Sequence, residues 1–155
     1  MPTFEWSKLV EYLCAFPPHT QELRPPCPQE RITEEERRLG QMPSGLVEML
    51  HLFNGGKLFV KTSPIITIFG LTLDSDSTSL DWFIDRFTPR WRATLGQTSD
   101  WVIGMTNYGG IVVLDSDQQV SEWDTSQRDW LYERYSLTSW IEKLMEDGTA
   151  YLKEV

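Results

Sequence analysis

Residues 101–124, WVIGMTNYGGIVVLDSDQQVSEWD, decide the fold. The stretch holds three runs rich in β-branched and aromatic residues, Trp101–Met105, Ile111–Leu114 and Val120–Trp123, and this composition is typical of strands. Only a few residues link each run to the next. Because a parallel crossover needs a dozen residues or more, these short links predict an antiparallel meander.

On either side of this stretch, apolar residues recur at helical spacing or in short β-rich runs. The expected helices cover 4–15, 33–40, 43–53, 80–87 and 137–145, and the expected additional strands cover 58–60 and 65–69. This order predicts an α+β fold, an antiparallel sheet with helices packed mainly on one face. One domain spanning 1–155 is expected, because the 155 residues suffice for a single core.

Local signals set the expected ends of these elements. Thr33 followed by three glutamates is typical of a capping box, and Ser136 is an expected N-cap. Gly40 and the pair Asp147–Gly148 are expected to end helices, because a residue with positive φ is favoured just past a helix end. Five prolines within 16–31 predict an extended loop there.

The net charge of the chain limits the classes of partner that it can bind. The sequence has 23 acidic and 14 basic residues, a net charge of −9. Such a surface repels phosphate, so neither nucleic acid nor an anionic membrane is an expected partner. Residues 100–155 hold 11 of the acids and only four of the bases. This C-terminal third is therefore either a solvated face or a docking face for a cationic protein.

Compartment signals favour the cytoplasm. No apolar run reaches the roughly 18 residues of a membrane-spanning helix, and the first residues lack the regions of a secretory signal. Cys14 and Cys27 do not form a disulfide framework and are expected as reduced thiols, with a lone surface disulfide left open.

Metal and nucleophilic chemistry have little support, so no catalytic residue, metal or cofactor is expected. The soft ligands Cys14, His19, Cys27 and His51 match no zinc spacing. His51 lies in line with an apolar helical stripe, which favours a core or boundary histidine. The loop that begins at Asp115 fails as a calcium loop, because the glycine and the bidentate acid that such loops require are absent.

One enzyme alternative is a phosphatase of the haloacid-dehalogenase type. Asp74 and Asp76 follow an apolar run and resemble the first motif of these enzymes, and Asp115 and Asp117 resemble their acidic metal-binding motif. The alternative is weak, because no lysine lies between Thr106 and Asp115. The short links also forbid the parallel sheet that these enzymes need.

Five segments, in order, resemble the SUKH superfamily, the Smi/Knr cell-wall-regulator-like domains that include many bacterial immunity proteins. The segments cover about 33–147 and read LGQMP at 39–43, LVEMLHLFNGG at 46–56, WVIG then NYGG at 101–110, VVLD then VSEWD at 112–124, and SWIEKL at 139–144. The matching motif residues, expected to be mainly structural, are Pro43, Asn54, Gly55, Gly56, Trp101, Gly104, Tyr108, Gly109, Trp123 and Asp124. The sequence departs from the pattern at Met42, usually leucine, and at Gln118–Gln119, usually glycine.

The resemblance implies a non-catalytic protein-binding domain. Many members are similar to antidotes that are made beside a polymorphic toxin and block it by direct binding. An acidic C-terminal third suits a basic, nuclease-type cognate toxin, because acids speed association with a cationic surface. The expected partner-binding residues are Asp115, Asp117, Glu122, Asp124 and Tyr108. The alternative is a regulatory or scaffold adaptor with the same fold. The toxin, the binding face and the oligomeric state stay open.

Overall fold

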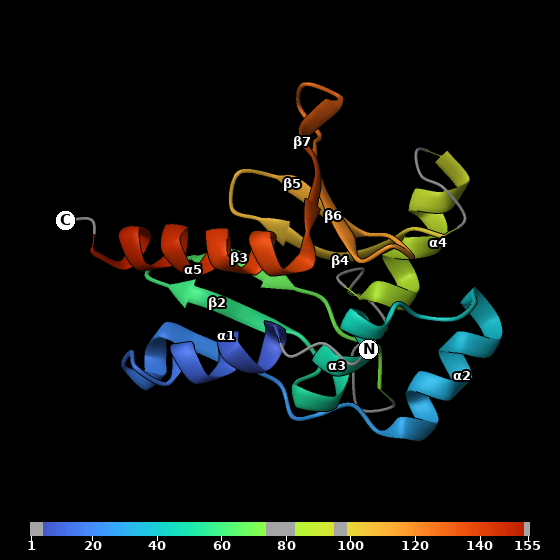
Figure 1. Ribbon diagram of the computed structural model, residues 1–155, viewed down its shortest axis with the longest axis horizontal. Coiled ribbons are helices and arrows are strands. Elements are labelled where there is room, and N and C mark those ends of the chain that lie inside the picture. Colours follow the sequence, from blue (N-terminus) through green and yellow to red (C-terminus); the bar gives the residue numbers. More distant parts are fainter. Residues whose placement is uncertain (1–4, 74–82, 95–98, 154–155) are drawn as a thin grey trace.

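The computed structural model describes residues 5–73, 83–94 and 99–153 (Figure 1). The helices are α1 (Glu5–Leu13), α2 (Gln29–Leu39), α3 (Ser44–Leu52), α4 (Ile84–Thr94) and α5 (Leu137–Lys153), with a single 3-10 turn at Pro18–Thr20. The strands are β1 (Gln21–Leu23), β2 (Gly56–Val60), β3 (Pro64–Ile68), β4 (Trp101–Thr106), β5 (Gly110–Leu114), β6 (Gln119–Asp124) and β7 (Asp129–Ser136). The predicted α+β class is confirmed.

Within the described residues, seven strands form one sheet in sequence order, from β1 at one edge to β7 at the other. Every neighbouring pair is antiparallel. The predicted meander of β4, β5 and β6 is therefore confirmed, and the sheet is wider than expected. β7 is an additional strand that pairs with β6, and β1 is an additional edge strand that pairs with β2.

This topology removes the structural basis of the phosphatase alternative. That alternative needs parallel strands joined by helical crossovers, whereas β4, β5 and β6 are joined by tight turns and pair antiparallel. Asp74 and Asp76, which carried its first motif, lie outside the described residues.

Helices cover the two faces of the sheet unequally. α5 contacts β2, β6 and β7, and α1 packs against both α3 and α5. We call the side of the sheet that these helices cover the inner face. α4 lies across the molecule from α1 and α5 (Figure 1) and packs on β4 from the opposite, outer face. The expectation that helices pack mainly on one face therefore holds for α1, α3 and α5. α4 is the exception.

One row of side chains shows how the outer face changes across the sheet. The residues are directly opposite one another in successive strands. In order from β1 to β7, the row reads Glu22, Lys57, Thr67, Met105, Ile111, Trp123 and Trp130. The β1–β3 part is thus polar. The β5–β7 part is apolar, and Trp91 of α4 packs edge-on against both Trp123 and Trp130.

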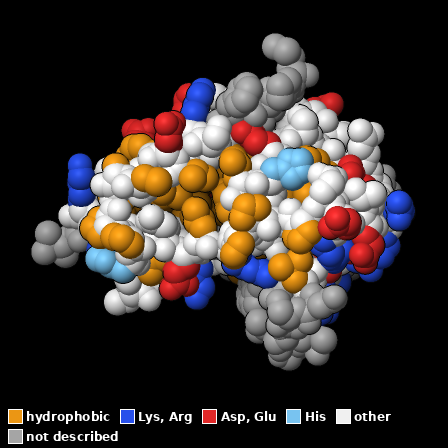
Figure 2. Space-filling view, turned by 90° about the horizontal axis from the view of Figure 1, so that it is seen from below, with side chains coloured by type: hydrophobic (Ala, Val, Ile, Leu, Met, Phe, Trp, Pro, Cys, Tyr) orange, Lys and Arg blue, Asp and Glu red, His pale blue; other side chains and the backbone are white. Residues whose placement is uncertain are grey.

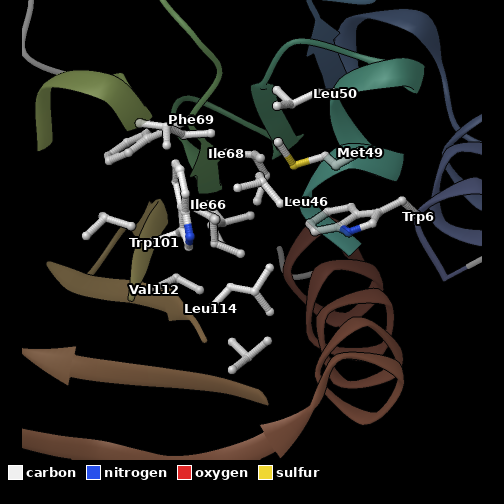
Figure 3. Close-up of a cluster of buried hydrophobic side chains, with 14 of the residues drawn as sticks. Trp6, Leu46, Met49, Leu50, Ile66, Ile68, Phe69, Trp101, Val112 and Leu114 are labelled. Atoms are coloured by element: carbon white, nitrogen blue, oxygen red, sulfur yellow. The ribbon is translucent and has the colours of Figure 1, made fainter. Parts of the chain in front are cut away.

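The core lies between the inner face and the helices. Figure 3 shows Trp6 of α1 and Leu46 and Met49 of α3 pointing toward Ile66 of β3 and Leu114 of β5. All five side chains are at most 2% exposed. Burial of this apolar area is what holds the helices on the sheet.

Two expected helix boundaries in the first half are wrong. α2 begins at Gln29, directly after Pro28, so Thr33 lies inside the helix and no capping box forms there. Proline fixes its own φ near the helical value and lacks the N–H that a first turn leaves unpaired, so it can mark a helix start. The expected loop at 16–31 also contains the 3-10 turn, β1 and the first residues of α2.

Two boundaries in the second half also differ. The helix expected at 80–87 is α4, which begins at Ile84; residues 80–82 lie outside the described residues. α5 does not end at Asp147–Gly148 but continues to Lys153. Gly148 is buried against the ring of Phe59, where an added Cβ would clash. This glycine thus permits close packing instead of ending the helix.

Among the described residues, no helix combines the length and the apolar character needed to cross a membrane.

Candidate functional site

The structure divides the expected partner-binding residues between the two ends of β6. Asp115 and Asp117 lie in the β5–β6 turn, and Leu114 pairs with Val120 at that end. Asp124 lies at the other end, where Gly110 of β5 is its partner. The six residues of β6 span about 20 Å at strand spacing. The expected residues therefore do not form one contiguous patch.

Glu122 lies between these ends and points into the protein. Its side chain is 4% exposed. One carboxylate oxygen accepts the hydroxyl of Tyr108 at 2.6 Å, and the other accepts Nε1–H of Trp140 in α5 at 3.1 Å. The expectation that Glu122 meets a partner is corrected, because its carboxylate joins β6, α5 and the β4–β5 turn from inside.

Tyr108 is the exposed part of the same contact. Its residue is 54% exposed in the β4–β5 turn, one of the largest apolar exposures among the described residues. The bond to Glu122 fixes the hydroxyl, so the ring is held in place before any partner arrives. A fixed, exposed tyrosine is a suitable anchor for a protein interface.

Asp124 organises the β6–β7 turn. Its Oδ1 accepts the hydroxyl of Ser126 at 2.8 Å and the backbone N–H groups of Ser126 at 2.9 Å and Gln127 at 3.2 Å. The hydroxyl bond, followed by the Gln127 amide, lowers the pKa of Asp124 below its ordinary value. Hydrogen bonds to an ionised carboxylate stabilise that form. Asp124 therefore has a local structural role.

Asp115 organises the turn at the opposite end, but it also holds a cation. Oδ1 accepts the backbone N–H groups of Asp117 and Gln119 at 2.9 and 3.0 Å. Oδ2 accepts a guanidinium N–H of Arg134 in β7 at 2.9 Å. This bond and the charge of Asp115 raise the pKa of Arg134, and the charges of Asp117 and Asp100 add to the effect.

A hollow of about 240 Å³ lies on the outer face beside this ion pair, and we call it the acidic hollow. Its polar and aromatic lining consists of Asp100, Asp115, Gln119, Ser121, Trp130 and Arg134. Asp100 is 9% exposed, and its Oδ2 accepts Nε1–H of Trp91 at 3.0 Å. The Trp91 ring in turn packs against the Trp130 ring, with 5.9 Å between centroids. Among the described residues, the hollow is thus bounded by the largely buried carboxylates of Asp100 and Asp115, the Trp130 indole and the Arg134 guanidinium, and Arg92 lies beside Asp100, whose carbonyl oxygen accepts its Nε–H at 2.8 Å.

The motif residues of the resemblance are structural where the structure describes their contacts. Asn54 is fully buried, and its side-chain amide exchanges hydrogen bonds with the backbone of Leu71 at 2.7 and 2.9 Å. Gly55 has a φ of +80°, and an added Cβ would lie 2.6 Å from the backbone nitrogen of Gly70. At Gly104, an added Cβ would lie 2.8 Å from a backbone oxygen of the neighbouring strand.

The remaining motif residues sit at turns and in the core. Pro43 directly precedes α3, and Gly56 and Gly109 have positive φ values of 159° and 84°. Trp101 is 1% exposed and lies under the guanidinium of Arg92, 4.7 Å from the ring centroid. Trp123 is half-buried in the tryptophan cluster.

A larger groove lies on the polar part of the outer face and encloses about 700 Å³. Its lining includes Glu22, Arg24, Lys57, Thr67, Phe83 and Met105. Lys57 stands 3.8 Å from Glu22, and the Arg24 guanidinium lies 5.4 Å from the centroid of Phe83. This groove has the size of a ligand site, and the described part of its lining has two cations, Arg24 and Lys57, and one acid, Glu22.

The helical side of the molecule has another character. Figure 2 shows hydrophobic side chains gathered over the half of this side where α1 lies, and charged side chains over the half where α2 lies.

The described residues contain no cluster of three side chains able to hold a metal ion. Cys14 is exposed and Cys27 is buried, and both are free thiols; burial raises the pKa of Cys27 to about 11. His51 is exposed, and its Nε2 lies 2.7 Å from Oε1 of Gln29. The expectation of a core or boundary histidine is therefore wrong.

Sequence reasoning missed Trp130 and Arg134 of the acidic hollow. Both residues lie on β7, a strand that was not expected. A signal for this strand was present, since aromatic residues alternate at Trp130 and Tyr132, as is typical of a half-buried strand.

No protein-family model matches the sequence, and a search of curated proteins finds no match.

Proposed function

We propose that this chain is a non-catalytic protein-binding domain that acts in the cytoplasm as an immunity protein and neutralises a basic cognate toxin by direct binding. The observation that carries the proposal is the acidic surface of the C-terminal third. Its exposed acids are Asp117, Asp129, Glu142, Glu146 and Asp147. The resemblance to immunity proteins of the SUKH superfamily supplies the class of partner.

The acids of this third outnumber its basic residues by 11 to 4, so its ion pairs leave most of the acids unneutralised. Arg134 pairs with Asp115 at 2.9 Å, and Lys143 pairs with Asp147 at 2.7 Å. A surface with such an excess of one sign steers a partner of the opposite sign and speeds its association. A nuclease-type toxin fits, because it must present cations to bind phosphate.

The experiment is affinity capture from the source cell, followed by expression of each captured protein with and without this chain. We expect one basic protein that arrests growth alone and is harmless when the chain is present. Captured proteins that leave growth unchanged would contradict the immunity function and favour the adaptor. Mg²⁺-dependent hydrolysis of a phosphate ester by the chain would contradict its non-catalytic character.

A matched pair of variants links rescue to the acidic surface. Glu142→Lys and Glu11→Lys make the same charge change at exposed positions, one on α5 and one on α1. We expect Glu142→Lys to weaken rescue more than Glu11→Lys. Equal effects would assign the benefit of the acids to net charge instead of to this surface.

A further inference from the structure

We propose that the acidic hollow accepts one cationic side chain of the partner, an arginine or a lysine, and that Arg134 occupies part of this place in the free protein. The inference rests on the proposed function for the identity of the partner as a basic protein. The inference adds the place where the partner makes contact and names Arg134 as the residue of this chain that competes with the partner's cation.

The charge balance of the hollow favours a further cation. The Asp100 residue is 9% exposed and the Asp115 side chain 14% exposed. Among the described residues, Arg134 is the cation of the lining, and Arg92 lies beside Asp100, where its Nε donates to the Asp100 carbonyl oxygen at 2.8 Å. Asp117, exposed in the adjoining turn, also acts on the Arg134 guanidinium. Carboxylates in a partly desolvated site attract a cation more strongly than carboxylates in bulk water. Among the described residues, the three carboxylates of Asp100, Asp115 and Asp117 thus face two guanidinium groups, those of Arg134 and Arg92, so negative charge is in excess by one even with Arg134 in place.

The shape of the hollow favours a long side chain with a planar or compact charged end. The indole of Trp130 forms one wall, and it is held by edge-on contacts with Trp91 and Trp123 at 5.9 and 5.1 Å between centroids. An arginine or lysine that lies along an indole gains cation–π attraction. About 240 Å³ gives room for one side chain and not for a folded element.

Arg134 is placed to be exchanged. Its side chain is 63% exposed, and the ion pair joins one guanidinium nitrogen to one oxygen of Asp115. Exposed ion pairs of this kind contribute little to stability, so an incoming cation can take over the carboxylate while Arg134 turns to solvent. The hollow therefore binds a guanidinium within the free protein already, which supports an affinity for that group.

The test is an NMR titration with acetyl-arginine amide, with acetyl-citrulline amide as its neutral counterpart. The Nε1–H of Trp91 donates to Asp100 in the hollow, whereas that of Trp140 donates to Glu122 on the inner face. The two indole signals are thus a reporter and an internal reference. We expect the arginine compound to shift the Trp91 and Trp130 signals and to leave Trp140 unchanged, and the citrulline compound to shift none. Equal shifts with both compounds, or no shift at Trp91 and Trp130, would overturn the proposal.

A pair of arginine variants tests the competition. Arg134 and Arg128 both have positive φ, 60° and 53°, and both are exposed, but Arg128 lies in the turn at the far end of β6. Arg134→Gln should tighten binding of acetyl-arginine amide on the order of fivefold, the effect of removing one unit charge about 4 Å away in water. Arg128→Gln should leave it within twofold. Weaker binding by Arg134→Gln, or the same gain in both variants, would overturn the competing role; an unchanged Trp140 signal verifies that each variant is folded.

The outcome separates this inference from the proposed function. Shifts at Trp91 without any toxin among the captured proteins would keep the cation site and contradict the immunity function. A captured, neutralised toxin whose affinity is the same for the wild type and for Arg134→Gln would keep the immunity function and contradict this contact.

Discussion

The two ends of β6 use acidic residues in different ways. In the half of β6 nearer the β4–β5 and β6–β7 turns, Glu122 and Asp124 accept hydrogen bonds from neutral donors of the same chain. At the other end, Asp115 accepts a guanidinium, and Asp100 and Asp115 border an open hollow. This net acidic chain thus contains acids enclosed by neutral donors of the fold and acids that border a hollow on the surface.

The two ends of β6 differ in whether their negative charge is enclosed in the protein or lies at the surface. Tyr108, Trp140 and the Ser126 hydroxyl donate hydrogen bonds but carry no charge, and Glu122 is enclosed by its donors. Its place in the core makes it a poor candidate for steering. Asp117 is exposed beside the hollow and can act on an approaching partner. Substitutions of Glu122 and Asp124 should therefore mainly lower stability, and substitutions near the acidic hollow should mainly weaken partner binding.

The largest expected effect is that of Glu122→Ala. Removal of the carboxylate leaves the buried Nε1–H of Trp140 without its acceptor and frees the Tyr108 hydroxyl. We expect a loss of about 3 kcal/mol in the free energy of unfolding, measured by urea denaturation. A loss no greater than that of Asp117→Ala would contradict the structural role of Glu122.

Tyr108→Phe sharpens the same point at smaller scale. The ring stays, and only the hydroxyl bond to Glu122 is removed. Since Trp140 still donates to Glu122, we expect a loss of about 1 kcal/mol in the free energy of unfolding. Unchanged stability would mean that the short bond to Glu122 is not needed to hold the turn.

Asp124→Asn should have the smallest effect on stability, and one that depends on pH. Because the folded protein lowers the pKa of Asp124 from 3.8, its ionised form stabilises the fold above that value, and the contribution is lost as pH falls through the folded pKa. The variant should therefore be less stable than the wild type at neutral pH, with a gap that narrows below about pH 4. Denaturation curves at pH 7 and pH 3 measure it; a constant gap would contradict the assignment.

The central meander could be predicted from the sequence because its signals are local. Short links join β4 to β5 and β5 to β6, and links of this length allow only antiparallel pairing of each strand with the next. The Gly40 stop and the Ser136 cap were also predictable: Gly40 follows α2, and Oγ of Ser136 accepts the Ser139 amide at 3.1 Å. In these cases the deciding contact is close in sequence.

What could not be predicted depends on partners distant in sequence. Gly148 has the local appearance of a helix stop, yet it lies against Phe59 in β2. Gln118 stands where the resembled family has glycine. It adopts a φ of 60°, and its side-chain oxygen accepts the Gly45 amide of α3 at 2.9 Å.

The candidate site shows the same limit. Burial of Glu122 depends on Trp140, 18 residues away, and the cation beside Asp115 comes from β7, 19 residues away. An acid count along the chain cannot separate the two kinds of acid. Only the register of β6 with β5 and β7 sends Glu122 inward and brings Arg134 to Asp115.

The most direct test of the account compares charge reversal at the two ends of β6 and measures association rates with the captured basic partner. Asp117→Lys and Asp129→Lys change the charge equally at exposed positions, the first beside the acidic hollow and the second at the far end. Screening limits each charge to about 8 Å at physiological salt, so their effects should be separable. The account predicts that Asp117→Lys slows association much more than Asp129→Lys does and weakens its salt dependence more. Equal slowing by both variants, or a greater effect of Asp129→Lys, would contradict it.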